Sequence, residues 1–293
     1  MSENKILGLS IIVPVFNEEK IIGEVIGNIK DELGKLGVEY ELIVINDGST
    51  DASRDILSHI GGIKLINNSR NKGYGASLKI GVAASKYDWV MFFDGDGQHK
   101  TEYIGEFLKY ADRYDMIAGA RYGYKGPLLR QPGKRILQLV ANYLAGEKIP
   151  DLNCGLRLMK KIHFLEYKHI FPDGFSLSTT STLAFFKEGL DIKYVPVTIK
   201  KRCGKSTVKV SDGLKTSLLI IRLIMLFSPL KIFLPIAFIG FVISVSIIIN
   251  DLVVSHFTLI SKSAGFLFTA SLLVFLFGLL ADQVAAIRRE MKK

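Results

Sequence analysis

Two kinds of hydrophobic pattern divide the chain. Up to about residue 210, short runs of β-branched and other apolar residues alternate with segments in which apolar residues recur every three or four positions. The first pattern is typical of buried strands and the second of amphipathic helices. Beyond residue 230 the chain contains two long uncharged apolar runs. We therefore expect a globular domain at residues 1–210, followed by a membrane part.

The alternation in the globular part predicts an α/β fold. Strands are expected at Ser10–Val15, Leu42–Asn46, Ile63–Ile66, Trp89–Phe93 and Met116–Ala118. Helices are expected near Glu18–Leu36 and from Thr50, Tyr74 and Thr101 onward. This βαβ alternation implies a mostly parallel sheet covered by helices on both faces. In such sheets ligands bind beyond the carboxyl ends of the strands, so the residues that follow each strand are the candidates for a site.

The two apolar runs have the length of transmembrane helices. They are Ile232–Asn250 and Ser263–Ala281, and each would extend roughly 28 Å as a helix, close to the hydrocarbon thickness of a bilayer. A pair of core helices is disfavoured because core helices of this length usually carry a polar face. Both outer flanks are basic, so the positive-inside rule predicts that residues 230–293 form a hairpin with a basic cytoplasmic tail.

Residues 211–229 connect the two parts. Most of Leu214–Phe227 is apolar, but Lys215 and Arg222 interrupt it and Ser228-Pro229 ends it. This pattern predicts an amphipathic helix that lies along the membrane interface. A third span is the alternative.

Composition excludes several classes of protein. With 48% hydrophobic residues among 293, the chain is too apolar to be mostly disordered. Two cysteines without a CxxC pair argue against a disulfide framework or a zinc site. The net charge of +10 is concentrated beside the apolar runs, which favours a membrane over a nucleic acid as partner. Met1–Gly8 lacks the features of a secretory signal, so the globular part is expected in the cytoplasm.

Polar turns follow four consecutive predicted strands. They read PVFNEE at Pro14–Glu19, NDGSTD at Asn46–Asp51, RNKGYG at Arg70–Gly75 and DGDGQ at Asp94–Gln98. Each turn alone is ordinary capping or turn chemistry. Because they share one edge of the sheet, they predict a common site.

The DGDGQ turn indicates a metal. An apolar strand delivers Asp94 and Asp96 into a glycine turn, so both carboxylates can face one cleft. Paired carboxylates suit Mg²⁺ or Mn²⁺, which keep waters and accept diphosphate oxygens as further ligands. An Asp-Gly turn without metal is the alternative, and His99 is interpreted as a surface residue at a helix start. The RNKGYG turn offers Lys72 and backbone amides as a candidate anion site.

Together these motifs resemble those of the family-two glycosyltransferases. Further motifs in the family's order are GAR at Gly119–Arg121, DLNCGLRLM at Asp151–Met159 and KRCGKS at Lys201–Ser206. The resemblance is closest to the dolichyl-phosphate mannose synthases and polyprenyl-phosphate glycosyltransferases, whose paired C-terminal spans also fit. It implies a Rossmann-like GT-A fold and an inverting, metal-dependent transfer of a sugar from a nucleotide-diphosphate sugar to a dolichyl or undecaprenyl phosphate.

The resemblance also implies roles for individual residues. The implied nucleotide-sugar site contains Pro14, Phe16, Glu18, Asp47, Lys72, Gly95, Arg121 and Arg202, with Asp47 at the base or ribose. The implied metal ligands are Asp94, Asp96 and Gln98, and the implied acceptor phosphate site contains Arg130, Arg135, Lys205 and Ser206. Arginine suits these sites because its guanidinium binds phosphate in a planar, bidentate way.

Asp151 joins Asp94 and Asp96 as a candidate catalytic residue. By position Asp151 could be a general base. A lipid phosphate with a second pKa near ~6 is already ionised at neutral pH, so we expect Asp151 to orient Arg157 or the acceptor instead. The helix at Arg135–Gly146 is expected to border the acceptor, with an ordinary core helix as the alternative.

The sequence departs from the family's usual pattern at two places. Asn46 stands where aspartate is usual, and Phe175–Thr182 carries hydroxyls where many mannose synthases have a glutamate. We favour a UDP-sugar over GDP-mannose as donor. A processive polysaccharide synthase would need a Gln-x-x-Arg-Trp motif, but the one tryptophan, Trp89, lies in a predicted strand. A catalytically silent nucleotide-sugar-binding scaffold is the alternative from another class, and the hairpin is a candidate surface for homo-oligomers.

Overall fold

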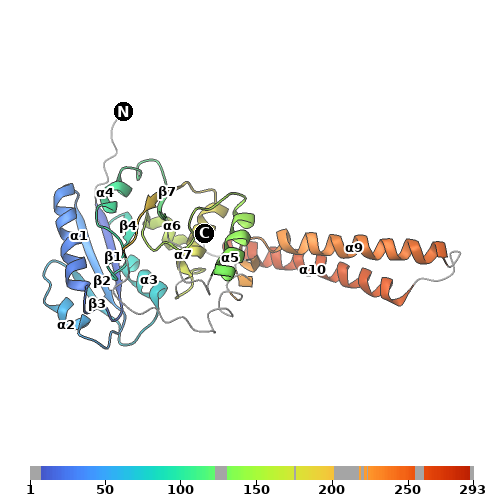
Figure 1. The fold of residues 1–293 in the computed structure, drawn as a ribbon, viewed down its shortest axis with the longest axis horizontal. Coiled ribbons are helices and arrows are strands. Elements are labelled where there is room, and N and C mark those ends of the chain that lie inside the picture. The colour runs from blue at the N-terminus through green and yellow to red at the C-terminus, as the bar shows by residue number, and fades with distance from the viewer. Residues whose placement is uncertain are drawn as a thin grey trace.

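A seven-stranded sheet forms the centre of the globular domain (Figure 1). The computed structural model describes residues 8–122, 131–174, 176–200, 218, 221–222, 224–254 and 261–290. The strand order is β3-β2-β1-β4-β6-β5-β7. The strands are β1 (Leu9–Val15), β2 (Tyr40–Asn46), β3 (Lys64–Asn67), β4 (Trp89–Phe92), β5 (Met116–Arg121), β6 (Arg157–Lys160) and β7 (Ile192–Val197).

The sheet is mostly parallel, as the sequence predicts. Strand β6 is antiparallel to both of its neighbours, β4 and β5, whereas every other pairing is parallel. The register pairs Val15 with Asn46, and Asn46 with Asn67. Strands β1, β2 and β3 therefore end at the same level, and the loops that follow them emerge side by side.

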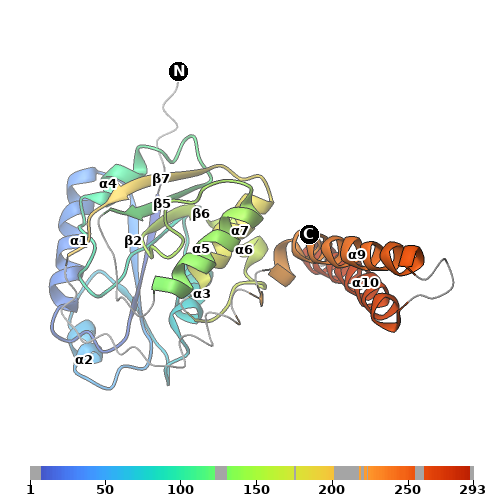
Figure 2. The same ribbon diagram turned by 45° about the vertical axis from the view of Figure 1, so that its right-hand side comes forward.

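Helices cover both faces of the sheet. In Figure 2, α1 and α4 lie on one side of the sheet and α3, α6 and α7 on the other. Each side has its own cluster of buried apolar residues. The helices of the globular domain are α1 (Ile22–Leu36), α2 (Ser53–Ser58), α3 (Tyr74–Ala84), α4 (Tyr103–Leu108), α5 (Gln131–Ala145), α6 (Lys161–Tyr167) and α7 (Leu177–Lys187).

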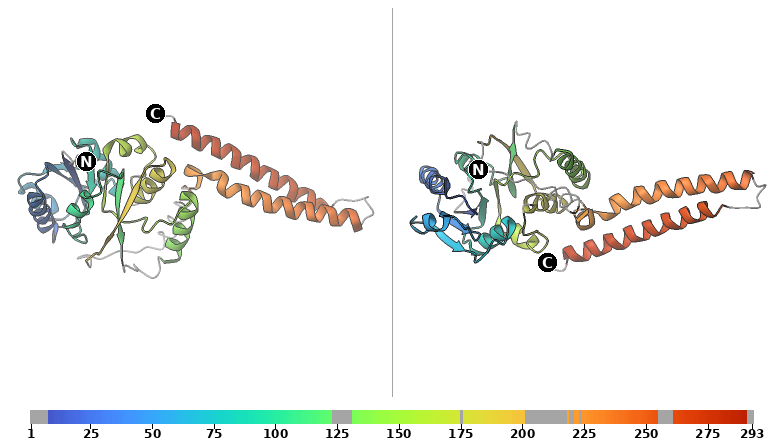
Figure 3. Two further views of the ribbon diagram at one scale, coloured as in Figure 1. Left: turned by 90° about the horizontal axis from the view of Figure 1, so that it is seen from above. Right: turned by 60° about the horizontal axis from the view of Figure 1, so that its bottom comes forward.

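Two long helices, α9 (Pro229–Val254) and α10 (Lys262–Glu290), project from the globular domain side by side (Figures 1 and 3). They contain the two predicted spans. Both are long and apolar enough to cross a membrane, and most of their side chains are exposed. Small residues allow the close packing between them, since a Cβ on Gly240 would collide with Ser271 and one on Gly278 with Phe233.

The hairpin contacts the globular domain at both of its ends. At the start of α9, the Tyr143 hydroxyl donates to the Lys231 carbonyl oxygen at 2.8 Å, and the Lys231 ammonium donates to the Leu144 carbonyl oxygen at 3.2 Å. At the end of α10, His169 Nε2 lies 3.3 Å from the Arg288 carbonyl oxygen. Figure 3 shows the end of α10 returning to the domain from which α9 departs.

The globular core extends beyond the boundary expected at residue 210. Leu226 and Phe227, 3% and 2% exposed, belong to the cluster that contains α3, α5 and α7. The interfacial helix predicted at 211–229 is described at residues 218, 221–222 and 224–227, which are helical. Leu218 and Ile221 are exposed there.

Candidate active site

The loops after β1 and β2 hold each other in place. Asn17 has a left-handed backbone conformation, with φ at 56°, which asparagine tolerates. Its side-chain oxygen accepts a hydrogen bond from the Thr50 amide at 2.8 Å, and its side-chain nitrogen donates to the Thr50 hydroxyl at 3.2 Å. The Glu18 amide donates to the Ser53 hydroxyl at 2.9 Å. The Phe16 ring, 43% exposed, is thus held on a fixed loop where it could stack on a base.

Asp47 organises the loop after β3. Its side chain is almost buried, with the residue 3% exposed. The Asn68 side chain and the Lys72 amide donate to Oδ1 at 2.8 and 2.9 Å, and the Gly73 amide donates to Oδ2 at 2.9 Å. The loop passes so close to Gly48, which has φ at +70°, that a Cβ there would lie 2.5 Å from the loop backbone.

Several backbone amides at and just before the start of α3, where the anion site is predicted, have partners within the protein. The amides of Lys72 and Gly73 donate to Asp47, and the amide of Ala76 donates to the Asp173 carbonyl oxygen at 3.0 Å. These three donors are therefore used within the protein. The Lys72 side chain is exposed, and its contact with the donor remains a prediction, as does the contact of Asp47 with the base or ribose.

Asn46 has a structural role that explains why it is not an aspartate. It is 2% exposed. Its side-chain nitrogen donates to Asn67 Oδ1 at 2.8 Å, and its side-chain oxygen accepts from the Ser49 amide at 3.1 Å. An amide donates and accepts at once, which an ionised carboxylate cannot do. These hydrogen bonds give a structural reason for asparagine at this position.

We expect Asn46→Asp to lower the free energy of unfolding by about 2 kcal/mol at neutral pH, because it buries a second carboxylate beside Asp47. Burial raises the pKa of the new carboxyl group, so the loss is present above the ordinary aspartate pKa and shrinks as the pH is lowered toward ~4. Denaturant unfolding at several pH values measures this. Asn46→Ala removes the same hydrogen bonds without charge and should show a loss that does not depend on pH; equal pH profiles for both variants would contradict the explanation.

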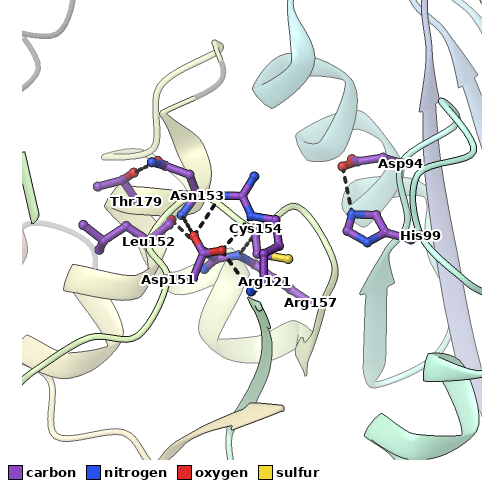
Figure 4. A network of polar contacts seen from close by, with 9 residues as sticks. All are labelled: Asp94, His99, Arg121, Asp151, Leu152, Asn153, Cys154, Arg157 and Thr179. Atoms are coloured by element: carbon purple, nitrogen blue, oxygen red, sulfur yellow. Dashed lines mark hydrogen bonds and ion pairs between the residues drawn. The ribbon is translucent and has the colours of Figure 1, made fainter. Parts of the chain in front are cut away.

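Asp94 follows β4 and the buried Phe93, and its carboxylate lies beside His99 (Figure 4). The Tyr74 hydroxyl donates to its Oδ1 at 2.9 Å, and His99 Nε2 lies 3.5 Å from its Oδ2. Burial raises the pKa of Asp94, but the hydrogen bond and charge of His99 and the hydrogen bond from Tyr74 outweigh it, so that pKa lies below the ordinary 3.8. Asp94 is ionised at neutral pH.

His99 is buried, so the interpretation of this residue as a surface residue is wrong. It is 8% exposed, and its ring packs edge-on against Phe93 with 6.0 Å between the ring centroids. The turn after Asp94 folds back and carries His99 underneath the carboxylate. Sequence patterns do not show this contact, because a histidine at a helix start is usually solvated.

The ionised carboxylate of Asp94 is a ligand type that a hard divalent cation prefers. The backbone at Gly155 packs directly against it, because a Cβ on Gly155 would collide with both carboxylate oxygens. Each Asp94 oxygen has one protein partner and retains a lone pair for a cation. Asp96 lies in the same turn, where its Oδ1 accepts from the Gln98 amide at 3.1 Å. Within the described part of the chain, no three His, Cys, Asp or Glu side chains could hold a metal by themselves, so diphosphate oxygens and water would complete the shell.

Gln98 connects the DGDGQ turn to Lys200, which follows β7 and directly precedes KRCGKS. Its side-chain nitrogen donates to the Lys200 carbonyl oxygen at 3.2 Å, and the Lys200 amide donates back to the Gln98 carbonyl oxygen at 2.9 Å. The side-chain oxygen Oε1 is the atom that the predicted metal role would use. The same contacts anchor the chain just before Arg202, Lys205 and Ser206, which lie outside the described residues.

Asp151 and Arg121 form a bidentate ion pair (Figure 4). Arg121 Nε donates to Oδ2 at 2.6 Å and Nη2 donates to Oδ1 at 2.9 Å, and the Asn153 amide adds a bond to Oδ1 at 2.9 Å. Burial raises the pKa of Asp151, but the hydrogen bonds and charge of Arg121 outweigh it and hold the pKa below 3.8. Asp151 is therefore a weak base at neutral pH, and it fixes the orientation of Arg121.

Arg157 is not the arginine that Asp151 orients, which corrects the sequence-based expectation. Its guanidinium is completely buried. Nε donates to the Cys154 carbonyl oxygen at 2.9 Å, Nη2 to the Leu152 carbonyl oxygen at 3.0 Å, and Nη1 to the Thr182 hydroxyl at 2.6 Å. Burial lowers the pKa of Arg157. Hydroxyls of α7, in the segment where many mannose synthases have a glutamate, thus contact this buried arginine.

The predicted residues that the structure describes gather mainly at the carboxyl edge of the sheet. Gly95 is buried against β1, and a Cβ there would lie 3.1 Å from the Pro14 carbonyl oxygen. Arg135 is exposed in the first half of α5, and Arg130 lies outside the described residues. Sequence reasoning missed Tyr74 and Gly155 as parts of the site. Both lie inside the quoted motifs, but their contact with Asp94 depends on the fold.

A mostly parallel GT-A sheet with ionised carboxylates at its carboxyl edge is the framework of a glycosyltransferase. The chain belongs to glycosyl transferase family 2, whose family model matches residues 10–168. Residues 228–287 match the family model described as the GtrB C-terminal hairpin. The chain is thus a glycosyltransferase with a membrane-associated hairpin.

Similar curated proteins support the family assignment. An uncharacterized protein of Methanocaldococcus jannaschii is 30% identical over 202 residues, covering 64% of this chain and 79% of that protein. The undecaprenyl-phosphate 4-deoxy-4-formamido-L-arabinose transferase of Salmonella typhimurium is 28% identical over 162 residues, covering 52% of this chain and 49% of that protein. The transferase of the same name from Photorhabdus laumondii is 29% identical over 175 residues, covering 57% of this chain and 53% of that protein. The chain matches about half the length of these two transferases.

Solved structures confirm the fold. Glucosyl-3-phosphoglycerate synthase from Mycobacterium tuberculosis in complex with phosphoglyceric acid superimposes with a TM-score of 0.60 at 19% identity, covering 74% of this chain and 79% of that chain. The same enzyme in complex with Mg²⁺ and UDP gives a TM-score of 0.57 at 19% identity, covering 74% and 78%.

Proposed function

We propose that the protein transfers a sugar, with inversion, from a nucleotide-diphosphate sugar to a polyprenyl phosphate such as dolichyl or undecaprenyl phosphate. One observation carries the proposal: the domain that holds the Asp94–Asp96 turn also anchors a hairpin long enough to cross a membrane. The names of the Salmonella and Photorhabdus relatives support the lipid acceptor. UDP in the similar solved structures supports a UDP-sugar over GDP-mannose.

On the donor side, the residues hold and orient a diphosphate. Phe16, Asp47 and Lys72 follow β1, β2 and β3 along the chain, and in this proposal they border the nucleoside. Asp94 and Asp96, with Gln98, would hold Mg²⁺ or Mn²⁺. Such a cation supplies charge that stabilises the departing diphosphate.

On the acceptor side, the residues hold a second anion near the same sugar carbon. An ionised lipid phosphate needs no general base. The low pKa of Asp151 agrees with this, because the carboxylate is used to aim Arg121 and not to remove a proton. Positioned cations that hold the acceptor phosphate beside the donor accelerate transfer by proximity and electrostatic stabilisation. Arg130, Arg135, Arg202, Lys205 and Ser206 are the further candidates for this role.

Helix α5 supports an acceptor route along the membrane. Its side chains Ile136, Leu139 and Tyr143 are 53%, 68% and 49% exposed, although a helix face of this kind is normally buried. Tyr143 is bonded to Lys231 at the start of α9. We infer that α5 borders the bilayer, with the globular domain and the C-terminus on the cytoplasmic side.

The test is a screen of UDP- and GDP-sugars against one short polyprenyl phosphate, with Mg²⁺, Mn²⁺ or EDTA, using the detergent-purified full chain. A lipid-linked sugar formed only with metal is the expected result. A silent scaffold would bind donor without transfer or hydrolysis, and a product that grows by repeated sugar addition would indicate a processive synthase.

We expect a chain ending at Ser228 to bind donor as the full chain does but to transfer poorly to long-chain lipid, because it retains the core residues Leu226 and Phe227 and lacks the hairpin. A chain ending at Val210 should be less stable by about 4 kcal/mol, the burial free energy of two large apolar side chains. Urea unfolding and assays with short and long acceptors measure these effects. Equal use of long-chain acceptor by the Ser228-ended and full chains would contradict the anchoring role of the hairpin.

A further inference from the structure

The loop that joins α5 to β6 has two chemically different faces. Its even-numbered residues Leu152, Cys154 and Leu156 are 2%, 0% and 0% exposed and pack into the core. On the odd-numbered side, Asp151 binds Arg121, and Gly155 lies against the Asp94 carboxylate. Alternation of this kind is that of an extended segment. The odd-numbered face therefore forms a wall of the site, between Asp94 and the Asp151–Arg121 pair.

The buried side chain of Arg157 supports this wall from the core side. Its guanidinium donates to the carbonyl oxygens of Leu152 and Cys154, the two residues that flank Asn153. The rigid, planar guanidinium thus binds the backbone on both sides of Asn153. The position of Asn153 on the wall is fixed by the protein before any substrate binds.

Asn153 is the member of this wall to which neither the family motifs nor the geometry has so far given a role. It lies between Asp151 and Gly155 in sequence and is exposed. Its side-chain oxygen accepts a hydrogen bond from the hydroxyl of Thr179 at 2.9 Å. Thr179, on α7, is completely buried, so its hydroxyl is in a fixed position. Figure 4 shows Asn153 beside Thr179, with Asp94 across from the Asp151–Arg121 pair.

The bond from Thr179 determines which end of the Asn153 amide is available. An asparagine amide has one accepting and one donating end. Because Thr179 uses the oxygen, the side-chain NH₂ group is left as the donor on an exposed residue. A fixed NH₂ group suits a neutral hydroxyl acceptor and discriminates against substrates that lack it, since its hydrogen bond would then be lost.

We propose that Asn153 is a specificity-determining residue whose side-chain NH₂ group donates to a hydroxyl of the transferred sugar, and that Thr179 is the positioning residue that sets its orientation. The proposal rests on the proposed function.

The experiment measures binding to the detergent-purified full chain by calorimetry with Mn²⁺. The probes are UDP-glucose, UDP-N-acetylglucosamine and GDP-mannose, each beside its free nucleoside diphosphate. We consider the nucleotide sugar that binds more tightly than its free diphosphate. Asn153→Ala should weaken the binding of this nucleotide sugar about threefold to tenfold, the value of one hydrogen bond. The affinity for the free diphosphate should not change. Thr179→Val, which keeps the shape and removes the hydroxyl, should show part of this loss, and Thr179→Ser should restore wild-type binding.

Asn28→Ala, on the exposed face of α1, is the matched control and should change neither affinity. The proposal would be overturned if Asn153→Ala weakened the binding of the nucleotide sugar and of the free diphosphate equally. It would also be overturned if the binding of neither were weakened. A change confined to the KM for polyprenyl phosphate would have the same consequence. Transfer by the wild-type chain reports the proposed function separately, so a transferase whose sugar affinity ignores Asn153 would refute this inference alone.

Discussion

Replacing Asp94 or Asp96 with Asn is expected to lower sugar transfer by at least about a hundredfold, the scale seen when a group that stabilises developing charge is removed. Each substitution keeps the shape of the side chain and removes the negative charge that would attract the cation. Asp94→Asn has a second effect, because the Tyr74 hydroxyl and His99 would then face a neutral amide. The measurement is the rate of lipid-linked sugar formation at saturating donor and Mg²⁺ or Mn²⁺.

Folding and metal affinity must be separated in this test. Asp112→Asn, at an exposed position after α4, is the matched control and should retain full activity. Circular dichroism and unfolding curves of the Asp96 variant should match those of the wild type, whereas binding of Mn²⁺ with UDP should weaken. More than about a tenth of wild-type activity in both variants would refute the metal assignment, because charge loss at a true cation site costs far more than tenfold.

Asp151→Asn is expected to lower turnover about tenfold, less than Asp96→Asn does, and Arg121→Ala to raise the KM for lipid phosphate or donor by about tenfold to a hundredfold. The physical reason is loss of charge-assisted hydrogen bonds. In the wild type, both oxygens of Asp151 bind the Arg121 guanidinium. Asparagine can accept only one of these bonds, so the orientation of the Arg121 guanidinium would be less well fixed.

A rate-versus-pH profile distinguishes orientation from general base catalysis. If Asp151 only aims Arg121, both proteins should show the same acidic limb. An acidic limb that disappears in Asp151→Asn, together with a loss as deep as that of Asp96→Asn, would make Asp151 a true base. Stability adds an independent check. The pKa of Asp151 lies below 3.8 in the folded protein, so its stabilising contribution is present at neutral pH and is lost as the pH falls through 3.8 toward the lowered value.

The strands and turns near the N-terminus could be predicted because their signals are local. Apolar runs of β-branched residues predict β1 to β5 to within a few residues, and the helix expected from Tyr74 begins at Tyr74. Parallel alternation also predicts that the polar turns meet at one edge. Strand β6 was not predicted, and its antiparallel direction breaks the βαβ pattern on which the prediction depends.

The pairings inside the site could not be predicted because they join residues far apart in sequence. Asp151 pairs with Arg121, thirty positions away, and not with Arg157 in its own motif. His99 is buried because the turn folds back under Asp94. Local composition describes which side chains are available at the edge of the sheet. It does not describe which donor each carboxylate receives, and that choice determines whether an aspartate can act as a base, a cation ligand or a support.

The two attachments of the hairpin have a consequence for how the enzyme meets its acceptor. A domain joined to a membrane helix by one linker can swivel, so its active site explores many heights and tilts above the lipid surface. Here the start of α9 is bonded to α5 and the end of α10 to the turn after α6. Two points of attachment leave little freedom to rotate. If the acceptor is a membrane lipid, as proposed, its phosphate would meet the active site at one depth, and the search for a productive encounter would be reduced to lateral diffusion in the bilayer plane.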